Sequence, residues 1–338
     1  TYCITRVVNT ETGDKYIKKV MDECFYDLYG YQYISFYQEL NVLSQLNHPS
    51  ILKLIGFDFN NDFKLTFITE YASNGTLDNF IYKKDKQNIL NDTNKLIIMY
   101  GIAAGMAYLH SHKILHRDLK LENIYLDEFN CPKISGFRVC KELSKEETTI
   151  KDDLKGTARY LSPETYKMNE YSYKSDVYSY GHLIYELLTN NTSFGKLTNV
   201  KEIKEELLEH KARPTFPKEI NLAYRELIER CWSEEPKSRP TFDEILTLLK
   251  TDPRFMTEMI NKEDFLYYVN KIDEYSVSYD RSKRNQELDD IINNKLSEFP
   301  KIDINLNLGG IDDTEIVRIV ANDNHIQLND FDNEKRFG

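Results

Sequence analysis

The stretch HRDLKLEN, residues 116–123, places a carboxylate, an ammonium group and a carboxamide in one short segment, at Asp118, Lys120 and Asn123. A long helical pattern, NKLIIMYGIAAGMAYLHSH (94–112), precedes it, and CPKISGFRVC (131–140) follows it. Loops mounted on a rigid scaffold are where proteins tend to carry their chemistry. The stretch is therefore the first candidate for an active-site loop.

The chain before this loop has strand patterns, and the chain around it has helical ones. TYCITRVVN and KYIKKVM, joined by a turn at Gly13, predict a hairpin. SFYQELNVLSQL (35–46) carries apolar residues at helical spacing, and ILKLIGF and LTFITEY predict two more strands. Further helices are predicted at 94–112, 176–189 and 221–232. The pattern predicts an α+β protein with a small β-rich lobe before a larger helical lobe.

Composition and charge exclude several classes of protein. The 338 residues are 41% hydrophobic, which is ample for a core, and no run of about 18 apolar residues predicts a membrane span. The net charge of −11 disfavours a nucleic acid or an anionic membrane as the main partner. Five scattered cysteines without a Cys-x-x-Cys pair suit a reducing compartment, so a cytoplasmic location is expected.

Several stretches resemble eukaryotic protein kinase motifs, in the family's order and spacing. ITEYASNGTL (68–77) resembles the hinge, HRDLKLEN the catalytic loop and GTARYLSPE (156–164) the substrate-docking segment. DVYSYG (176–181) and CWSEEPKSRPTF (231–242) resemble later helices of the family, the second in the style of tyrosine-kinase-like and tyrosine kinases, whereas Lys120 is typical of the Ser/Thr branch. The resemblance implies a bilobal kinase fold, with an N-lobe at 1–73 and a C-lobe at 74–251. Residues 252–338 then form an acidic extension, with helices predicted at 255–272 and 286–299.

The resemblance also implies roles for the residues of the catalytic loop. Asp118 would accept the proton of a substrate hydroxyl, Lys120 would neutralise the transferring phosphate, and Asn123 would hold a magnesium ion. Elsewhere in the C-lobe, Asp176 would brace the loop, and Glu164 would form the family's ion pair with Arg239. Because such a loop also holds its lobe together, these residues have a structural interpretation beside the catalytic one.

The N-lobe would supply the nucleotide side of the site. A lysine paired with Glu39 would grip the ATP phosphates; a gap-free match makes it Lys19, and shortening the preceding turn by one residue makes it Lys18. We prefer Lys19. The hinge would place Thr69 as gatekeeper, followed by Tyr71 and Ala72.

Three features depart from the family pattern. Gly136 stands where the family has a magnesium-binding aspartate, and it offers no oxygen to a hard cation. Two positions that contact the adenine ring in the family carry bulkier side chains here: Ile17, or Tyr16 in the other register, above the ring, and Tyr125 below it. These side chains predict a narrowed adenine slot. Tyr2 or Cys3 occupies the place of the last glycine of the phosphate-covering loop.

The activation segment suggests a regulatory site. In related kinases the residue corresponding to Arg117 pairs with a phosphorylated activation loop, and Thr148 and Thr149 are the candidate acceptors here. Their acidic neighbours favour the alternative, a solvated loop.

Two main interpretations follow, beside a third in which the chain is a purely structural component of a larger assembly, attached through its acidic tail. In the first, the chain is a pseudokinase that acts as an allosteric or scaffolding module on protein partners, such as an active kinase or a larger assembly. In the second, it is a weak or unconventional Ser/Thr kinase in which another carboxylate, such as Glu122, recruits the metal. The family implies ATP and magnesium as cofactors, and the three departures argue against both.

Overall fold

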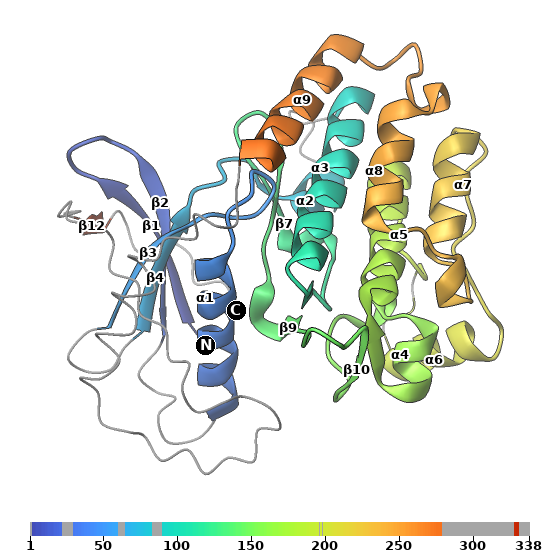
Figure 1. Ribbon diagram of the computed structural model, residues 1–338, viewed down its shortest axis with the longest axis horizontal. Helices are drawn as coiled ribbons and strands as arrows, with labels where there is room; N and C mark the ends of the chain where they lie inside the picture. The colour runs from blue at the N-terminus through green and yellow to red at the C-terminus, as the bar shows by residue number, and fades with distance from the viewer. Residues whose placement is uncertain are drawn as a thin grey trace. The chain divides into compact units, whose positions relative to one another are not determined.

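The computed structural model describes residues 2–21, 30–59, 65–82, 90–195, 197, 199–278 and 328–330. It divides into two compact units. The N-terminal unit comprises Thr1–Leu46, Lys53–Tyr71 and Val277–Gly338, and the C-terminal unit comprises Asn47–Leu52 and Ala72–Ser276. Figure 1 shows the strands of the first unit and the helices of the second.

The N-terminal unit is an antiparallel sheet with the strand order β12-β1-β2-β4-β3, accompanied by helix α1 (Figure 1). Its elements are β1 (Tyr2–Asn9), β2 (Lys15–Met21), α1 (Gly30–Gln45), β3 (Leu54–Phe59), β4 (Leu65–Glu70) and β12 (Leu328–Asp330). The predicted β1–β2 hairpin is present, and Gly13 adopts a φ of 78° in its turn. Leu40, Leu43 and Leu46 are buried, as the helical spacing predicts.

The C-terminal unit is mainly helical. Its elements are β5 (Gly75–Thr76), α2 (Leu77–Tyr82), α3 (Asp92–Ser111), β6 (Ile114–Leu115), β7 (Ile124–Leu126), β8 (Pro132–Ile134), β9 (Lys141–Glu142), β10 (Thr149–Lys151), α4 (Pro163–Met168), β11 (Glu170–Ser172), α5 (Tyr173–Thr189), α6 (Val200–Leu208), α7 (Leu222–Cys231), α8 (Phe242–Thr251) and α9 (Lys262–Ser278). The core lies on α3 and α5, most of whose residues are buried.

Capping side chains explain where the two central helices begin. The side chain of Asn91 accepts from the backbone N–H of Asn94, whose own side chain accepts from the backbone N–H of Asn91. Ser172 and Ser175 form the same reciprocal arrangement at the start of α5. Such caps satisfy backbone donors that the first helical turn leaves unpaired.

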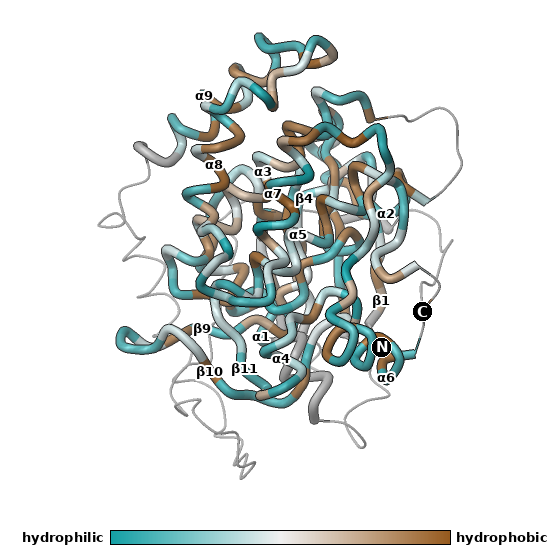
Figure 2. Tube along the Cα trace, turned by 90° about the vertical axis from the view of Figure 1, so that its right-hand side faces the viewer, coloured by the Kyte–Doolittle hydropathy of each residue, from teal (hydrophilic) through white to brown (hydrophobic). Residues whose placement is uncertain are grey.

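The expected extension begins within the C-terminal unit. Its predicted helix at 255–272 is present but begins later, as α9, because Asn261 accepts hydrogen bonds from the N–H groups of Glu263 and Asp264. Figure 2 shows brown, hydrophobic residues among teal, hydrophilic ones along α9. The helix predicted at 286–299 lies outside the described residues. In the described part of the chain, no helix is both long and apolar enough to cross a membrane.

Candidate active site

The catalytic loop is fixed by one buried carboxylate from α5. Asp176 accepts from the backbone N–H groups of His116 and Arg117 at 3.0 and 2.9 Å, and His110 Nε2 lies 2.9 Å from it. Burial alone raises the pKa of Asp176, but these hydrogen bonds and the nearby histidines outweigh it, and the pKa is lowered. Because Arg117 has a left-handed φ of 65°, the loop needs such anchoring. Asp176 thus lies where the resemblance placed it.

His116 adds a second anchor. Its Nε2 lies 2.9 Å from the carbonyl of Ser135, which can only accept, and its Nδ1 accepts from the N–H of Asp118. Burial lowers the pKa of His116, so the ring is neutral with the proton on Nε2. The ring therefore joins the catalytic loop to the segment that carries Gly136.

Asp118, Lys120 and Asn123 meet in one hydrogen-bond network with Thr157. Thr157 Oγ1 donates to Asp118 Oδ1 at 2.7 Å and accepts from Lys120 Nζ at 2.7 Å. Asn123 Nδ2 donates to the Asp118 carbonyl at 2.7 Å and to Asp118 Oδ2 at 3.1 Å. Lys120 Nζ lies 3.3 Å from Asp118 Oδ2. Both oxygens of Asp118 therefore accept hydrogen bonds from within this unit.

Gly136 and Asn123 together do not fit a magnesium site. Gly136 has left-handed φ and ψ of 86° and 37°, which glycine adopts without strain. A Cβ there would lie 2.4 Å from Asn123 Cγ, 2.5 Å from its Nδ2 and 2.6 Å from its Oδ1. The space next to Gly136 is thus occupied by the side chain of the other expected ligand, which is itself bonded to Asp118.

The N-terminal unit contains the expected lysine–glutamate pair. Lys19 Nζ lies 2.7 Å from Glu39 Oε1, both side chains are buried, and the ammonium is 5.2 Å from the centre of the Phe67 ring. Adjacent strand residues point to opposite faces of a sheet. Lys18 therefore projects away from Glu39, and of the two alternatives the structure pairs Glu39 with Lys19.

The other expected nucleotide-side residues are described unit by unit. In the N-terminal unit, Thr69 is fully buried on β4 opposite Ile17, and its Oγ1 has no hydrogen-bond partner among the described residues. Tyr71 is half-buried, and the guanidinium carbon of Arg6 lies 5.9 Å from the centre of the Tyr71 ring. In the C-terminal unit, Ala72 is buried and Tyr125 is half-buried on β7. The narrowed adenine slot stays a prediction.

Arg117 has an unphosphorylated partner in the activation segment. Its Nη1 lies 2.6 Å from Asp152 Oδ2, its Nε donates to the carbonyl of Val139, and its guanidinium lies 5.1 Å from the centre of the Tyr171 ring. Partial burial raises the pKa of Asp152, but Arg117 and Lys155 together lower it to about 2.

Thr148 and Thr149 are both exposed, and Thr149 begins β10, opposite Ser172 of β11. Among the described residues, the carboxylate paired with Arg117 is that of Asp152. The regulatory role of the two threonines stays a prediction.

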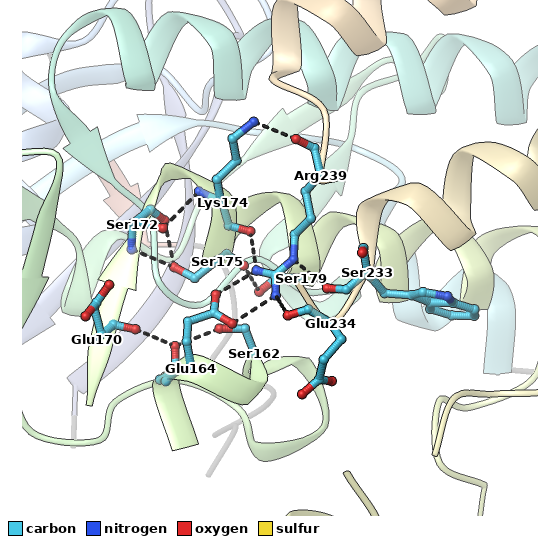
Figure 3. A network of polar contacts seen from close by, with 12 residues as sticks. Ser162, Glu164, Glu170, Ser172, Lys174, Ser175, Ser179, Ser233, Glu234 and Arg239 are labelled. Carbon is cyan, nitrogen blue, oxygen red and sulfur yellow. Dashed lines mark hydrogen bonds and ion pairs between the residues drawn. The ribbon is translucent and has the colours of Figure 1, made fainter. Parts of the chain in front are cut away.

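A buried ion pair supports the substrate-docking segment. Arg239 donates from Nη1 to Glu164 Oε1 at 2.6 Å and from Nη2 to Oε2 at 2.9 Å, so the pair is bidentate. Figure 3 shows the guanidinium also bonded to the carbonyls of Lys174 and Ser233. The resemblance implied this pair through the segments GTARYLSPE and CWSEEPKSRPTF, and the structure brings the two residues together.

Comparison with known proteins decides the family. The sequence model described as "Protein tyrosine and serine/threonine kinase" matches residues 11–249. The chain belongs to this kinase family. The α+β kinase fold predicted from the motifs is thereby confirmed, with strands in the N-terminal unit and helices in the C-terminal one.

Similar curated proteins are kinases of plants and amoebae. Serine/threonine/tyrosine-protein kinase HT1 of Arabidopsis thaliana is 36% identical over 64% of this chain and 54% of its own length. Serine/threonine-protein kinase CTR1 of the same plant is 30% identical over 70% of this chain and 28% of its own length. An RGS domain-containing serine/threonine-protein kinase of Dictyostelium discoideum is 32% identical over 64% of this chain and 18% of its own length. The chain thus spans about half or less of these relatives.

Sequence reasoning missed two members of the site. Thr157 connects Lys120 with Asp118, and its position directly after Gly156 in GTARYLSPE was the available signal. Asp152, which pairs with Arg117, lies in the same segment as Thr148 and Thr149, and the sequence indicated only these two threonines as regulatory residues there. Because ion pairs between distant loops depend on tertiary folding, spacing alone gave no sign of the second contact.

Proposed function

We propose that this kinase-family chain is a pseudokinase, an allosteric or scaffolding signalling module that handles ATP and magnesium poorly. The carrying observation is the side chain of Asn123, which lies in the space beside Gly136 that the family's metal-binding carboxylate would need. In an active kinase the magnesium ion neutralises charge on the phosphates. Losing one preorganised charge contact costs on the order of 3 kcal/mol, roughly a hundredfold in rate.

The retained parts of the site favour a folded interaction module. The Asp176 anchor, the Glu164–Arg239 pair and the Lys19–Glu39 pair all remain formed. Each of them stabilises the fold of its own unit without any ligand. Selective loss of the metal ligand beside an intact scaffold is what selection for a binding surface would leave.

The expected partners are proteins, such as an active kinase or a larger assembly, and the expected location is the cytoplasm. Two features support this proposal: the net charge of −11, which disfavours nucleic acid, and the scattered cysteines, which suit a reducing compartment. Proximity labelling with the chain, compared with a matched soluble control protein, would test both parts. Labelling of the same proteins to the same extent by the control would count against a specific protein partner.

A thermal-shift titration tests the central proposal. The chain is titrated with ATP, with and without magnesium, because a ligand that binds only the folded state raises Tm with its concentration. We expect no shift that depends on magnesium. A magnesium-dependent shift, followed by transfer of the γ-phosphate that is lost in Asp118→Ala, would refute the proposal.

The intact network around Asp118 favours a second candidate, a weak Ser/Thr kinase. Asp118, Lys120 and Thr157 are held together by short hydrogen bonds, and exposed Glu122 follows in the same loop as the alternative metal ligand. This candidate requires that Glu122→Gln abolish any magnesium-dependent binding. If binding is present and survives that substitution, Glu122 is not the ligand.

A further inference from the structure

Helix α9 lies beyond the matched kinase region and covers a face of the C-terminal unit. Four of its side chains are buried at helical spacing, at Phe265, Tyr268, Val269 and Ile272. The Phe265 ring packs edge-on against Tyr100 of α3 at 5.7 Å between ring centres. Its neighbours on the other side of the helix are exposed: Tyr267, for example, is 74% exposed. One face of α9 is therefore docked, and the other faces solvent.

The surface under α9 contains a notch that fits a tyrosine. Gly101 of α3 has no side chain, and a Cβ there would lie 2.3 Å from Tyr268 Oη and 2.5 Å from Pro132 Cγ. The Tyr268 hydroxyl occupies the space that a side chain at position 101 would need, and it lies 3.2 Å from Ser50 Oγ. Burial raises the pKa of Tyr268, so the hydroxyl remains protonated and can donate. Gly101, Pro132 and Ser50 thus define a site for this one side chain.

Two aromatic residues of α9 reach the loop Asn47–Leu52. Besides the Tyr268–Ser50 contact, Tyr275 Oη donates to the carbonyl of Asn47 at 2.9 Å, and its ring lies edge-on to His48 at 5.9 Å. The loop is bonded on its other side to β8, where Leu52 and Ser50 exchange backbone hydrogen bonds with Ile134. The loop is therefore held between β8 and α9.

The loop that α9 contacts, Asn47–Leu52, occupies a particular position in the chain. The loop directly follows α1, the helix that carries Glu39 of the Lys19–Glu39 pair. Within the C-terminal unit, the contacts with β8 and α9 restrain Asn47–Leu52, the segment of this unit that follows α1 in the chain. The apolar face of the amphipathic helix α9 packs against α3, as in helix-in-groove recognition, but here within one chain.

We infer that the groove formed by α3, Pro132 and Asn47–Leu52 is a regulatory docking site, and that its occupant is this chain's own α9. Tyr268 is the anchor, and Tyr275 is the second contact. The docked helix holds the loop after α1 in place, and its release frees that loop. The inference does not depend on whether the chain transfers phosphate.

Hydrogen–deuterium exchange of the full chain tests the inference. Tyr268→Ala removes the anchor, and Tyr267→Ala, at the adjacent exposed position, is the matched control. We expect the backbone amides of residues 47–52 to exchange at least about tenfold faster in Tyr268→Ala. Amides of α7 should keep the wild-type rate, and Tyr267→Ala should match wild type throughout.

A gentler variant keeps the test decisive if Tyr268→Ala unfolds the unit. Tyr268→Phe keeps the ring and removes only the hydroxyl that contacts Ser50. Loss of one hydrogen bond should speed exchange of the 47–52 amides about fivefold. Unchanged exchange of the loop while α9 itself becomes labile would overturn the inference. An equal rise across the whole unit would also overturn it, because α9 would then stabilise the core without controlling the loop.

Discussion

Restoring the family's aspartate at Gly136 should destabilise the protein and should not rebuild a magnesium site. A Cβ at this position would lie 2.4 to 2.6 Å from three atoms of the Asn123 side chain, closer than non-bonded atoms approach. Asn123 would have to move, and it would lose its hydrogen bonds to the carbonyl and the carboxylate of Asp118. Any residue other than glycine must also hold the left-handed φ of 86°.

The expected magnitude follows from these contributions. A lost hydrogen bond costs about 1 kcal/mol, or about 2 kcal/mol when one partner is charged. The left-handed backbone adds about 1 kcal/mol. Gly136→Asp should therefore lower the free energy of unfolding by about 4 kcal/mol, which is a large share of the roughly 5–15 kcal/mol of a typical domain.

Urea denaturation, with and without magnesium, measures this effect against two controls. Gly136→Ala has the same clash and the same φ without a carboxylate, so its loss should fall within about 1 kcal/mol of the Asp variant. Gly195→Asp tests the backbone contribution alone, because Gly195 has a φ of 58° and, apart from its chain neighbours, no atom of a described residue lies within 4 Å of its Cβ position. Wild-type stability for Gly136→Asp, or stability recovered by magnesium, would refute the reasoning about Asn123.

Three further predictions concern groups elsewhere in the C-terminal unit. Burial, aided by Arg213 and Arg239, lowers the pKa of His182 to about 3, so the ring stays neutral in the folded state. The free energy of unfolding therefore decreases as pH falls below about 6.5, by roughly 3 kcal/mol at pH 4.5. Urea denaturation should show that His182→Leu removes this part of the pH dependence. Glu164→Gln should cost about 3–5 kcal/mol, because it leaves the buried charge of Arg239 unpaired, and a loss under 1 kcal/mol in the same assay would contradict this. Asp152→Asn should make the activation segment about five- to thirtyfold more sensitive to limited proteolysis, whereas Asp153→Asn, at the adjacent exposed position, should not.

The regular elements could be predicted from the sequence because local patterns determine them. The β1–β2 hairpin needed only strand propensity and a glycine for its positive φ. Helix α3 was predicted at 94–112 and observed at Asp92–Ser111, since apolar periodicity marks its length. The start of α9 was placed too early, because the cap at Asn261 was not recognised among polar neighbours. Short strands such as β9 and β10 carry too few residues to show a pattern.

Contacts between distant residues were predictable only where a family motif supplied both partners. Glu164 and Arg239 are far apart in sequence, and the resemblance alone suggested that they pair. No motif pointed to Asp152 as the partner of Arg117, or to the notch that Gly101 leaves for Tyr268. Both depend on tertiary packing that spacing does not encode. The glycine at position 136 was visible in the sequence, but the hydrogen bonds that Asn123 makes beside it were not.

The hydrogen bonds of Asn123 bear on whether the family's aspartate can be restored at Gly136. In the sequence, Gly136 is a single missing ligand, and a single reversion should repair it. In the structure, Asn123 donates to both the backbone and the side chain of Asp118, so the second expected metal ligand stabilises the catalytic loop. A reversion at Gly136 alone would then break contacts that the fold uses. Repair would require Asn123 to exchange its bonds to Asp118 for bonds to a metal, and the free energy of metal binding would have to offset the loss of both.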